Sequence, residues 1–508
     1  MNIRQNSSAE FDRRFGTFDE HDTTDLLNNR NVQKFQWGTR HTFALLCFIG
    51  TCLMYANRFN LSVAIVAMVR RNATVDISAN DSSSGTCPVP VNAQNVTDSI
   101  HSGEFYWDDM AKFFVLGASF FGYFLFCVPG GRAADKFGGH LTMAVGTAVI
   151  GLMCVLSPLA ARTSYKCFIV VRFVQGAAEG SISPSIKRLI VNWVTVKERS
   201  KYMAAIYSGI RIGSPMAMLI SGLMSSSPEY GGWPASFYLF GSLSLLWSIC
   251  WLFITRNSPQ LHPKISQQEL VYLKETIDAS HDHASTIPWK GMFTSVPFIS
   301  TLCVHLSFYM VEWLLLLEIP LYLNTVQHYT ITKNSITAAS PSLATFLFTL
   351  LYIWIIDRAI HKGQISIVNV RRVSMAIGGF IPSLALIALA LVRCNRLAVL
   401  ACLFIATLPL AAGYCAFICT PADIAPRHTG IMTGIACIFT GLAGFILSMY
   451  TGLVIQNNND LGSWQIVFLT VAVFNIITTI FYLCTVTADI QHWNYDDDNY
   501  SSKIRLNE

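Results

Sequence analysis

The chain alternates long apolar runs with short polar segments, and twelve such runs can be marked along it. Most are close to the roughly 20 residues that an α-helix needs to cross a bilayer. A longer polar stretch, residues 255–296, divides them into two sets of six. The pattern predicts an all-α membrane protein whose twelve transmembrane helices form two pseudo-symmetric six-helix bundles. The predicted spans lie near 41–69, 108–129, 140–161, 165–192, 200–224, 233–254, 297–323, 335–356, 373–392, 396–420, 428–455 and 464–486.

The polar segments between and around these runs predict the domain organisation. Residues 1–40 have little apolar surface to bury and predict a disordered cytoplasmic tail. Within the central linker, the stretch ISQQELVYLKETI predicts a short surface helix. The other predicted units are an N-terminal bundle at 41–254 with a polar loop at 70–107, a cytoplasmic linker at 255–296, a C-terminal bundle at 297–486 and a cytoplasmic tail at 487–508.

Two independent signals predict the orientation in the membrane. With both tails in the cytoplasm, most of the 35 Lys and Arg residues fall on the cytoplasmic side, as the positive-inside rule requires. The loop at 70–107 carries three glycosylation sequons, at Asn72, Asn80 and Asn95, which indicate the opposite side. Both signals therefore favour cytoplasmic termini.

Composition supports the same class. Charged residues make up 13% of the chain, about half the share usual in soluble domains. Most of the 14 cysteines fall inside apolar runs, where a free cysteine acts as a small hydrophobe, so we expect no disulfide framework. No cleavable signal peptide is expected either, because the first 40 residues lack an apolar core.

The fourth predicted span carries charge where a membrane helix should carry none. Arg172 and Glu179 are seven residues apart, two helical turns, and so lie on nearly the same face. Gly176 and Gly180 follow that face as a small-residue strip that lets a neighbouring backbone approach closely. Ionisable groups at membrane depth are functional-site candidates by default.

A glycine-rich turn is predicted between spans two and three, in the segment PGGRAADKFGG at 129–139. Gly131 and Gly138 permit a tight cytoplasmic turn. Asp135 can form exposed ion pairs with neighbouring helix ends, which are individually weak and can form and break as helices move. We interpret these three residues as a gating motif.

These features resemble the major facilitator superfamily, and several strings resemble its anion-transporter branch, which includes sialin, the vesicular glutamate transporters and the type I sodium/phosphate cotransporters. The resemblance covers about residues 41–493. The strings are Tyr55-Ala-Asn-Arg58-Phe-Asn60, Arg172-x-x-Gln175-Gly176-x-x-Glu179-Gly180, Glu198-Arg199-Ser200, Gly232-Trp233-Pro234, His262-Pro263-x-Ile265-Ser266, Ile287-Pro288-Trp289-Lys290, Asp423-Ile-Ala-Pro426 and Trp464-Gln465-x-Val-Phe468.

The resemblance implies roles for the residues that match. Arg58 and Arg172 match arginines of spans one and four, which implies contact with a substrate anion. Tyr55 and Tyr123 match tyrosines that approach substrate in sialin-like members, and Glu179 matches a glutamate implicated in proton coupling. No cofactor is implied.

Elementary chemistry supports these roles independently. Arginine suits a carboxylate because its planar fork is bidentate and always charged. A nearby glutamate can couple transport to protons by competition: protonated Glu179 frees an arginine for substrate, whereas ionised Glu179 pairs with it. A second interpretation is a permanent Arg172–Glu179 pair that only fixes helix packing. Buried pairs often give no net stability, which favours the functional interpretation.

Four positions depart from the family pattern. Lys187 replaces a usual histidine, Arg211 replaces a neutral polar residue, and Glu312 stands at a normally aromatic position of span seven. Phe308 replaces the arginine of glutamate transporters, which counts against glutamate as the substrate. Arg211 and Glu312 could form a pair between the halves, Glu312 could recognise the cationic group of an amphoteric substrate, or it could bond a local hydroxyl or backbone group. We include Glu312 among the candidate coupling residues.

Other polar residues have simpler interpretations. Glu318, near the far end of span seven, is expected to be solvated, and Asp423 is expected to cap the start of the next helix. His305 and several tryptophans are expected to pack or to anchor at interfaces.

We therefore expect a secondary active transporter of small organic anions, such as acidic sugars, amino-acid-like molecules or other carboxylates, coupled to protons by alternating access. The alternatives are a sodium-dependent phosphate or urate cotransporter and a non-transporting membrane sensor. No catalytic motif appears, so no enzyme is predicted, and nothing suggests a nucleic-acid partner. An acidic dileucine at Asp22, Leu26 and Leu27 predicts contact with sorting adaptors, which favours a lysosomal or vesicular membrane over the plasma membrane.

Overall fold

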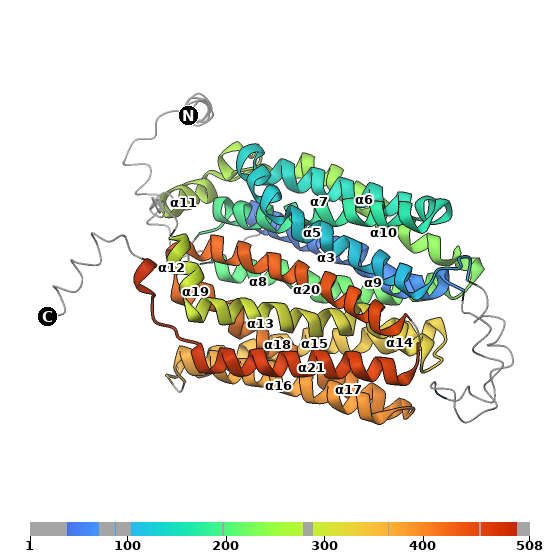
Figure 1. The fold of residues 1–508 in the computed structure, drawn as a ribbon. Coiled ribbons are helices and arrows are strands. Elements are labelled where there is room, and N and C mark those ends of the chain that lie inside the picture. Colours follow the sequence, from blue (N-terminus) through green and yellow to red (C-terminus); the bar gives the residue numbers. More distant parts are fainter. Residues whose placement is uncertain are drawn as a thin grey trace.

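The computed structural model describes residues 38–70, 87, 103–195, 198–277, 288–363, 365–456 and 459–494. Long helices run side by side along one direction in Figure 1, with most helices of the first half in the upper part of the view and most of the second half in the lower part. The first half contains α3 (Thr39–Met68), α5 (Asp109–Phe137), α6 (Gly139–Thr163), α7 (Tyr165–Trp193), α8 (Arg199–Tyr207), α9 (Gly209–Ser225) and α10 (Gly232–Ile254). The second half contains α13 (Val296–Trp313), η6 (Leu314–Glu318), α14 (Ile319–Thr325), α15 (Ile331–His361), α16 (Ile367–Val392), α17 (Arg396–Thr407), α18 (Leu410–Phe417), α19 (Thr420–Ile424), α20 (Thr429–Ile455) and α21 (Leu461–Thr485).

Within these ranges, 11 helical stretches are long and apolar enough to cross a bilayer. The remaining predicted span is α7, of 29 residues, whose charged side chains lower its hydropathy. Ser164 caps its start, because the serine Oγ accepts a hydrogen bond from the backbone nitrogen of Cys167 at 3.1 Å. The prediction of an all-helical twelve-span protein is confirmed. The division into domains stays a prediction, and the sequons and dileucine lie outside the described residues.

The seventh predicted span is interrupted rather than continuous. Between α13 and α14 the chain forms a turn of π-helix, η6, which ends at Glu318. Pro320 accounts for the break, because proline lacks a backbone N–H and its ring clashes with the carbonyl four residues earlier in an α-helix. A π turn accommodates that misfit, and such turns are frequent at functional sites.

The linker contains α11 (Gln267–Ile277) and α12 (Trp289–Thr294), and the predicted surface helix corresponds to α11. Its Glu269 accepts hydrogen bonds from the backbone nitrogens of Thr39 and Arg40, at 2.9 and 3.1 Å. A carboxylate at a helix N-terminus satisfies free donors and complements the helix dipole. The linker therefore caps the first transmembrane helix.

The predicted glycine strip brings α7 against α5. A Cβ atom on Gly176 would lie 1.8 Å from the carbonyl oxygen of Ser119, and one on Gly180 would lie 3.0 Å from that of Tyr123. The two backbones thus touch, as small residues permit in membrane helices. This contact fixes the height and rotation of the face that carries Arg172 and Glu179.

The two halves meet through α5 against α20 and α9 against α15. Glycines again permit the approach: a Cβ atom on Gly444 would lie 2.3 Å from the ring of Phe120, and one on Gly222 would lie 2.1 Å from the Ser335 hydroxyl. Gly222 is near the end of α9 and Ser335 near the start of α15. We call this side of the molecule, where α3 ends at Met68 and α15 begins, the loop side.

A disulfide corrects the expectation about cysteines. Cys87, in the polar loop at 70–107, is bonded to Cys394, in the short turn between α16 and α17. The backbone nitrogen of Cys87 also donates to the carbonyl of Val326, at 3.1 Å. Both cysteines lie outside the apolar runs, and 307 residues separate them, so the apolar pattern carried no signal for the bond. The bond joins the two halves on the loop side.

Two acidic residues also differ from expectation. Asp423 forms an ion pair with Arg371 of α16, with Nε and Oδ2 2.8 Å apart, rather than capping the following helix. Glu318 is completely buried rather than solvated. Both sit where helices are broken, so the distance along a span did not indicate their depth.

Candidate functional site

Arg58 of α3 and Glu179 of α7 form a buried ion pair near the middle of the first half. Glu179 Oε2 accepts a hydrogen bond from Arg58 Nε at 2.7 Å and a second from Nη2. The two side chains are 2% and 0% exposed. Two charge-assisted hydrogen bonds in a site without water hold the pair together strongly. Removing either partner would leave an uncompensated buried charge.

Aromatic rings surround the Arg58 guanidinium. The ring centroids of Tyr55, Phe120, Tyr123 and Trp313 lie 5.4, 5.1, 5.0 and 5.9 Å from its central carbon. Ring faces attract a cation, and the attraction grows when water is excluded. Trp313 belongs to the second half, so the cage around Arg58 is completed only when the two halves are together.

Arg172 lies in the same region but has different hydrogen-bond partners. Its guanidinium donates to the Gln175 side chain at 2.8 Å and to the backbone carbonyls of Asn57 and Arg58 at 3.4 and 3.2 Å. The direct Arg172–Glu179 pair considered from the sequence is not formed, because Glu179 pairs with Arg58. Arg172 therefore holds the α3 backbone at the residue that pairs with Glu179.

Arg211 and Glu312 are joined across the halves. Arg211 Nη1 of α9 lies 3.0 Å from Glu312 Oε1 of α13, and the Tyr414 hydroxyl donates to the other oxygen of Glu312. The Arg211 guanidinium also stacks over the Tyr414 ring, at 4.3 Å. The cross-half pair considered from the sequence is confirmed, together with a local hydroxyl partner. The sequence did not indicate Tyr414 as a partner of Glu312, because a single tyrosine in an apolar run has no specific interpretation.

Lys187 also reaches toward the second half. Its Nζ lies 3.8 Å from the Cys437 sulfur of α20. A thiol is a weak acceptor, so this contact holds a lysine at the interface without a carboxylate. Along α7, Lys187 therefore adds a positive charge beyond Glu179, at the other end from Arg172.

The predicted glycine turn is shorter than expected. Helix α5 continues through Gly131 to Phe137, and only Gly138 turns the chain, with a φ of +88° that suits glycine. Asp135 forms an exposed ion pair with Arg188 near the end of α7. The predicted link between this segment and a neighbouring helix end is present, and its gating role stays a prediction.

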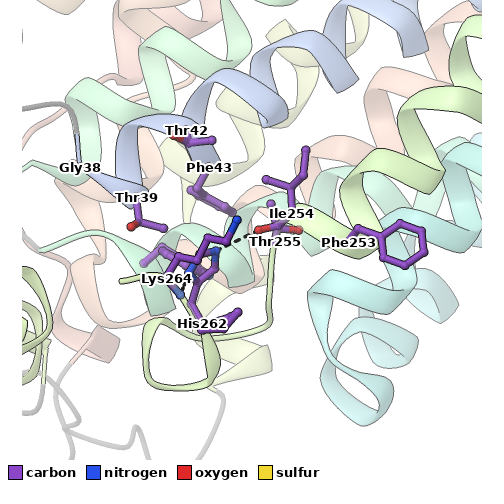
Figure 2. A pocket seen from close by; sticks show the side chains of 11 residues that line it. Gly38, Thr39, Thr42, Phe43, Phe253, Ile254, Thr255, His262 and Lys264 are labelled. Carbon is purple, nitrogen blue, oxygen red and sulfur yellow. Dashed lines mark hydrogen bonds between the residues drawn. The ribbon is translucent and has the colours of Figure 1, made fainter. Parts of the chain in front are cut away.

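A cavity of about 460 Å³ opens at the start of α3, far from these charges. Figure 2 shows its lining, with Phe43 and Thr42 of α3 facing Thr255, His262 and Lys264 after α10. Arg58 is 15 residues further along α3 than Phe43, or about 22 Å at 1.5 Å per residue. This cavity is not part of the charged site.

Comparison with known proteins agrees with the fold and the motifs. A family model described as Major Facilitator Superfamily matches residues 47–448. A putative inorganic phosphate cotransporter of Drosophila melanogaster is 30% identical over 469 residues, covering 91% of this chain and 88% of that protein. Human sialin is 28% identical, covering 90% of this chain and 91% of sialin.

Solved structures show the same arrangement of helices. The inward-open xylose transporter XylE from E. coli matches with a TM-score of 0.64 and 15% identity, covering 88% of this chain and 96% of that one. A bacterial homolog to the human lysosomal transporter Spinster, in an inward-facing and unoccupied conformation, matches with the same TM-score and identity. At this identity the likeness is one of fold.

Proposed function

The chain belongs to the major facilitator superfamily, in the branch that contains sialin and the sodium-dependent phosphate transporters, and from that premise we propose that it moves small organic anions by proton-coupled alternating access. The proposed substrates carry a carboxylate, as acidic sugars and amino-acid-like molecules do. The observation that carries the proposal is the buried Arg58–Glu179 pair with Arg172 beside it.

The net positive charge of this region favours an anionic substrate. Two guanidinium groups stand against one carboxylate, all three buried, so one positive charge is uncompensated while Glu179 is ionised. Protonation of Glu179 leaves two. A positive surplus in a low-dielectric site attracts a small anion and repels a cation.

Coupling follows from competition for one guanidinium. The Arg58 fork makes two bonds to Glu179, which are the bonds that a substrate carboxylate would take. When Glu179 binds a proton, its attraction for Arg58 falls and the fork becomes available to substrate. When substrate leaves, Arg58 again favours the ionised carboxylate, and the proton is released. Substrate and proton therefore travel together.

The remaining site residues support this exchange. Arg172 positions the α3 backbone at Arg58, while Tyr55 and Tyr123 line the path to the guanidinium and limit its solvation. Glu312 holds Arg211 across the halves, and an amphoteric substrate could replace that pair with its own two charges. Trp313 contacts Arg58 and Glu312 contacts Arg211, and both residues belong to α13. Motion of the second half would therefore alter the surroundings of Arg58 and Arg211.

We place the protein in a lysosomal or vesicular membrane with both termini in the cytoplasm. The acidic dileucine supports the membrane, and the positive-inside rule and the three sequons support the orientation. An acidic compartment also supplies the proton gradient that the mechanism uses. Sorting adaptors that bind the dileucine would direct the protein there.

The test is uptake into proteoliposomes with an imposed pH gradient, using labelled sialic acid, aspartate and inorganic phosphate as probes. We expect one carboxylate probe to accumulate in the wild type. Glu179→Gln should remove gradient-driven accumulation but retain exchange of probe for probe, because the neutral amide keeps the shape of the protonated acid. Arg58→Ala should abolish both.

Glu104→Gln is the matched control, since Glu104 forms an exposed ion pair with Arg162 outside the charged site. It should behave as wild type. Gradient-driven accumulation that persists in Glu179→Gln would contradict the coupling, and full transport by Arg58→Ala would contradict the substrate site.

Sodium-coupled phosphate transport is the second candidate, because relatives include a putative inorganic phosphate cotransporter and the mouse sodium-dependent phosphate transport protein 3. Phosphate also suits an arginine fork. Replacing sodium with choline at constant pH separates the two candidates. Loss of phosphate uptake on sodium removal would favour this second function, and unchanged uptake would exclude it.

A further inference from the structure

Glu318 is a buried carboxyl group that the proposed exchange does not use. It ends the π-helical turn η6 and is 0% exposed. One oxygen, Oε1, accepts a hydrogen bond from the Ser448 hydroxyl of α20 at 3.0 Å, whereas Oε2 is buried without a hydrogen-bond partner. A buried carboxylate with one neutral donor is costly, and such a group in a membrane protein calls for an explanation.

No cation compensates this group among the residues that the structure describes, since the recorded ion pairs involve other acids. Segment η6 packs against α13, α14 and α3, and Ser448 brings α20 into contact. Most ionisable groups on these elements and on the facing part of α5 have other recorded neighbours. Examples are Glu312 with Arg211 and Tyr414, Arg58 with Glu179, Tyr322 with Gln327, Tyr450 with Thr470, His305 with Thr301, Cys437 with Lys187, Lys112 with Asp109, and the rings of Tyr55 and Tyr309 on Arg58 and Trp313. The free thiols on α3 and α13 are Cys47 and Cys52 of α3 and Cys303 of α13, and Arg40 and His41 lie at the start of α3.

The group also lies where the two halves meet on the loop side. A Cβ atom on Gly117 of α5 would lie 3.3 Å from the Ser448 side chain, so the serine that binds Glu318 faces the first half. Segment η6 itself contacts α3 of the first half. Separation of the halves on this side would remove those covers and admit water to Glu318.

We propose that Glu318 is a second proton-binding residue of the transport cycle, protonated while the halves are closed on the loop side and exchanging its proton with that side when they open. This inference rests on the proposed proton-coupled function. The ligand is a proton that hydronium on the loop side delivers to the oxygen Oε2. One O–H bond of hydronium breaks, which leaves water, and one O–H bond forms on the carboxylate, which becomes neutral.

The protonation state then decides whether the loop side can close. A neutral acid tolerates the apolar surroundings that an ionised one does not, because burial disfavours the charged form. Acid on the loop side would protonate Glu318 and favour closure, which commits the bound substrate to the other side. The π turn also sets the direction of the Glu318 side chain, because a continuous α-helix would rotate that side chain differently about the helix axis.

Two readouts on the purified full-length protein test this inference. The first is the infrared absorption of a protonated carboxyl group in neutral buffer, compared between wild type and Glu318→Gln. We expect a band in wild type that Glu318→Gln loses and that the exposed control Glu104→Gln retains. The band tests protonation directly, even if no transport substrate is found.

The second readout is probe exchange in proteoliposomes as the pH on the loop side is varied. We expect Glu318→Gln, which imitates the protonated acid, to keep exchange but to lose most of its dependence on that pH, with a response at least about tenfold smaller than wild type. Ser448→Ala should shift the dependence rather than remove it.

An infrared spectrum unchanged by Glu318→Gln would overturn the inference, and so would an unaltered pH dependence of exchange. Failure of the proposed function looks different, because the wild type would then show no proton-driven accumulation while the carboxyl band was still present. If Glu318→Gln does not fold, Glu318→Asp supplies the same spectral comparison. A band that does not shift in Glu318→Asp would likewise count against the assignment.

Discussion

Arg58 and Arg172 lie in the same buried region, yet their contacts give them separate roles. Among the described residues, the recorded partners of the Arg58 guanidinium are the ionisable Glu179 side chain and aromatic faces, which a substrate can replace. Arg172 bonds two backbone carbonyls and an amide, which no substrate replaces. The first arrangement suits exchange and the second suits positioning.

This difference predicts different effects for the same conservative change. Arg58→Lys loses the bidentate fork, so we expect the KM for the carboxylate probe to rise about tenfold or more, with thermal stability near wild type. Arg172→Lys loses bonds to the α3 backbone, so we expect a loss of about 1–3 kcal/mol in stability with a much smaller change in KM. Uptake kinetics and thermal unfolding in detergent measure the two effects. Equal KM changes in both variants would contradict the division of roles.

The partners of these residues could be predicted only in part. The sequence indicated Arg58, Arg172 and Glu179 as a set, because charge within an apolar run is conspicuous. It did not indicate that Glu179 pairs with Arg58, since that depends on how α3 and α7 face each other. Aromatic residues such as Trp313 are common in membrane helices, so nothing in the sequence distinguished the cage around Arg58.

At the scale of elements, the contact between α5 and α7 sets the depth of the site. The predicted span at 165–192 agrees with α7 to within one residue at its end. At 29 residues this helix is longer than the roughly 20 that a bilayer requires, so hydrocarbon thickness sets a minimum length and not the end of the helix. The π turn in the seventh span was not predicted, since hydropathy reports length and not helical register. Pro320 is visible in the sequence, but a proline indicates only that an α-helix is disturbed and not that the chain answers with a π turn.

The glycine strip gives a direct test at this scale. Gly176→Ala places a methyl group against the Ser119 carbonyl, and overpacking of this kind costs about 1–3 kcal/mol. We expect a lower unfolding temperature and reduced transport. Gly434→Ala on α20 is the matched control, because nothing lies within 4 Å of its Cβ position, and alanine should be neutral or slightly stabilising there. Equal stability of the two variants would contradict the close approach of α5 and α7.

At the scale of the whole molecule, the halves are linked on both sides of the membrane. The linker joins them along the chain, with Glu269 of α11 capping α3. On the loop side the Cys87–Cys394 disulfide joins the first-half loop to the turn between α16 and α17. In the proposed alternating access the halves move relative to each other, and this bond would then limit how far the loop side can open.

The disulfide predicts how the two fragments of a cut chain migrate on a denaturing gel with and without reductant. A protease site inserted in the linker at 278–287 should allow the chain to be cut in two. Without reductant the fragments should still migrate together, and with reductant they should separate. The two fragments of the cut Cys394→Ser variant should separate without reductant. Those of Cys167→Ser, which removes an exposed free thiol, should still migrate together. Separation of the cut wild type without reductant would show that the bond does not form.

In the proposed mechanism substrate and Glu179 compete for Arg58, so substrate binding should be accompanied by proton uptake. Binding of the carboxylate probe to purified protein can be measured by calorimetry in buffers of different ionisation enthalpy, which gives the number of protons exchanged. We expect a net uptake of protons by wild type and little or none by Glu179→Gln. The same proton uptake in both proteins, or none in wild type, would contradict it.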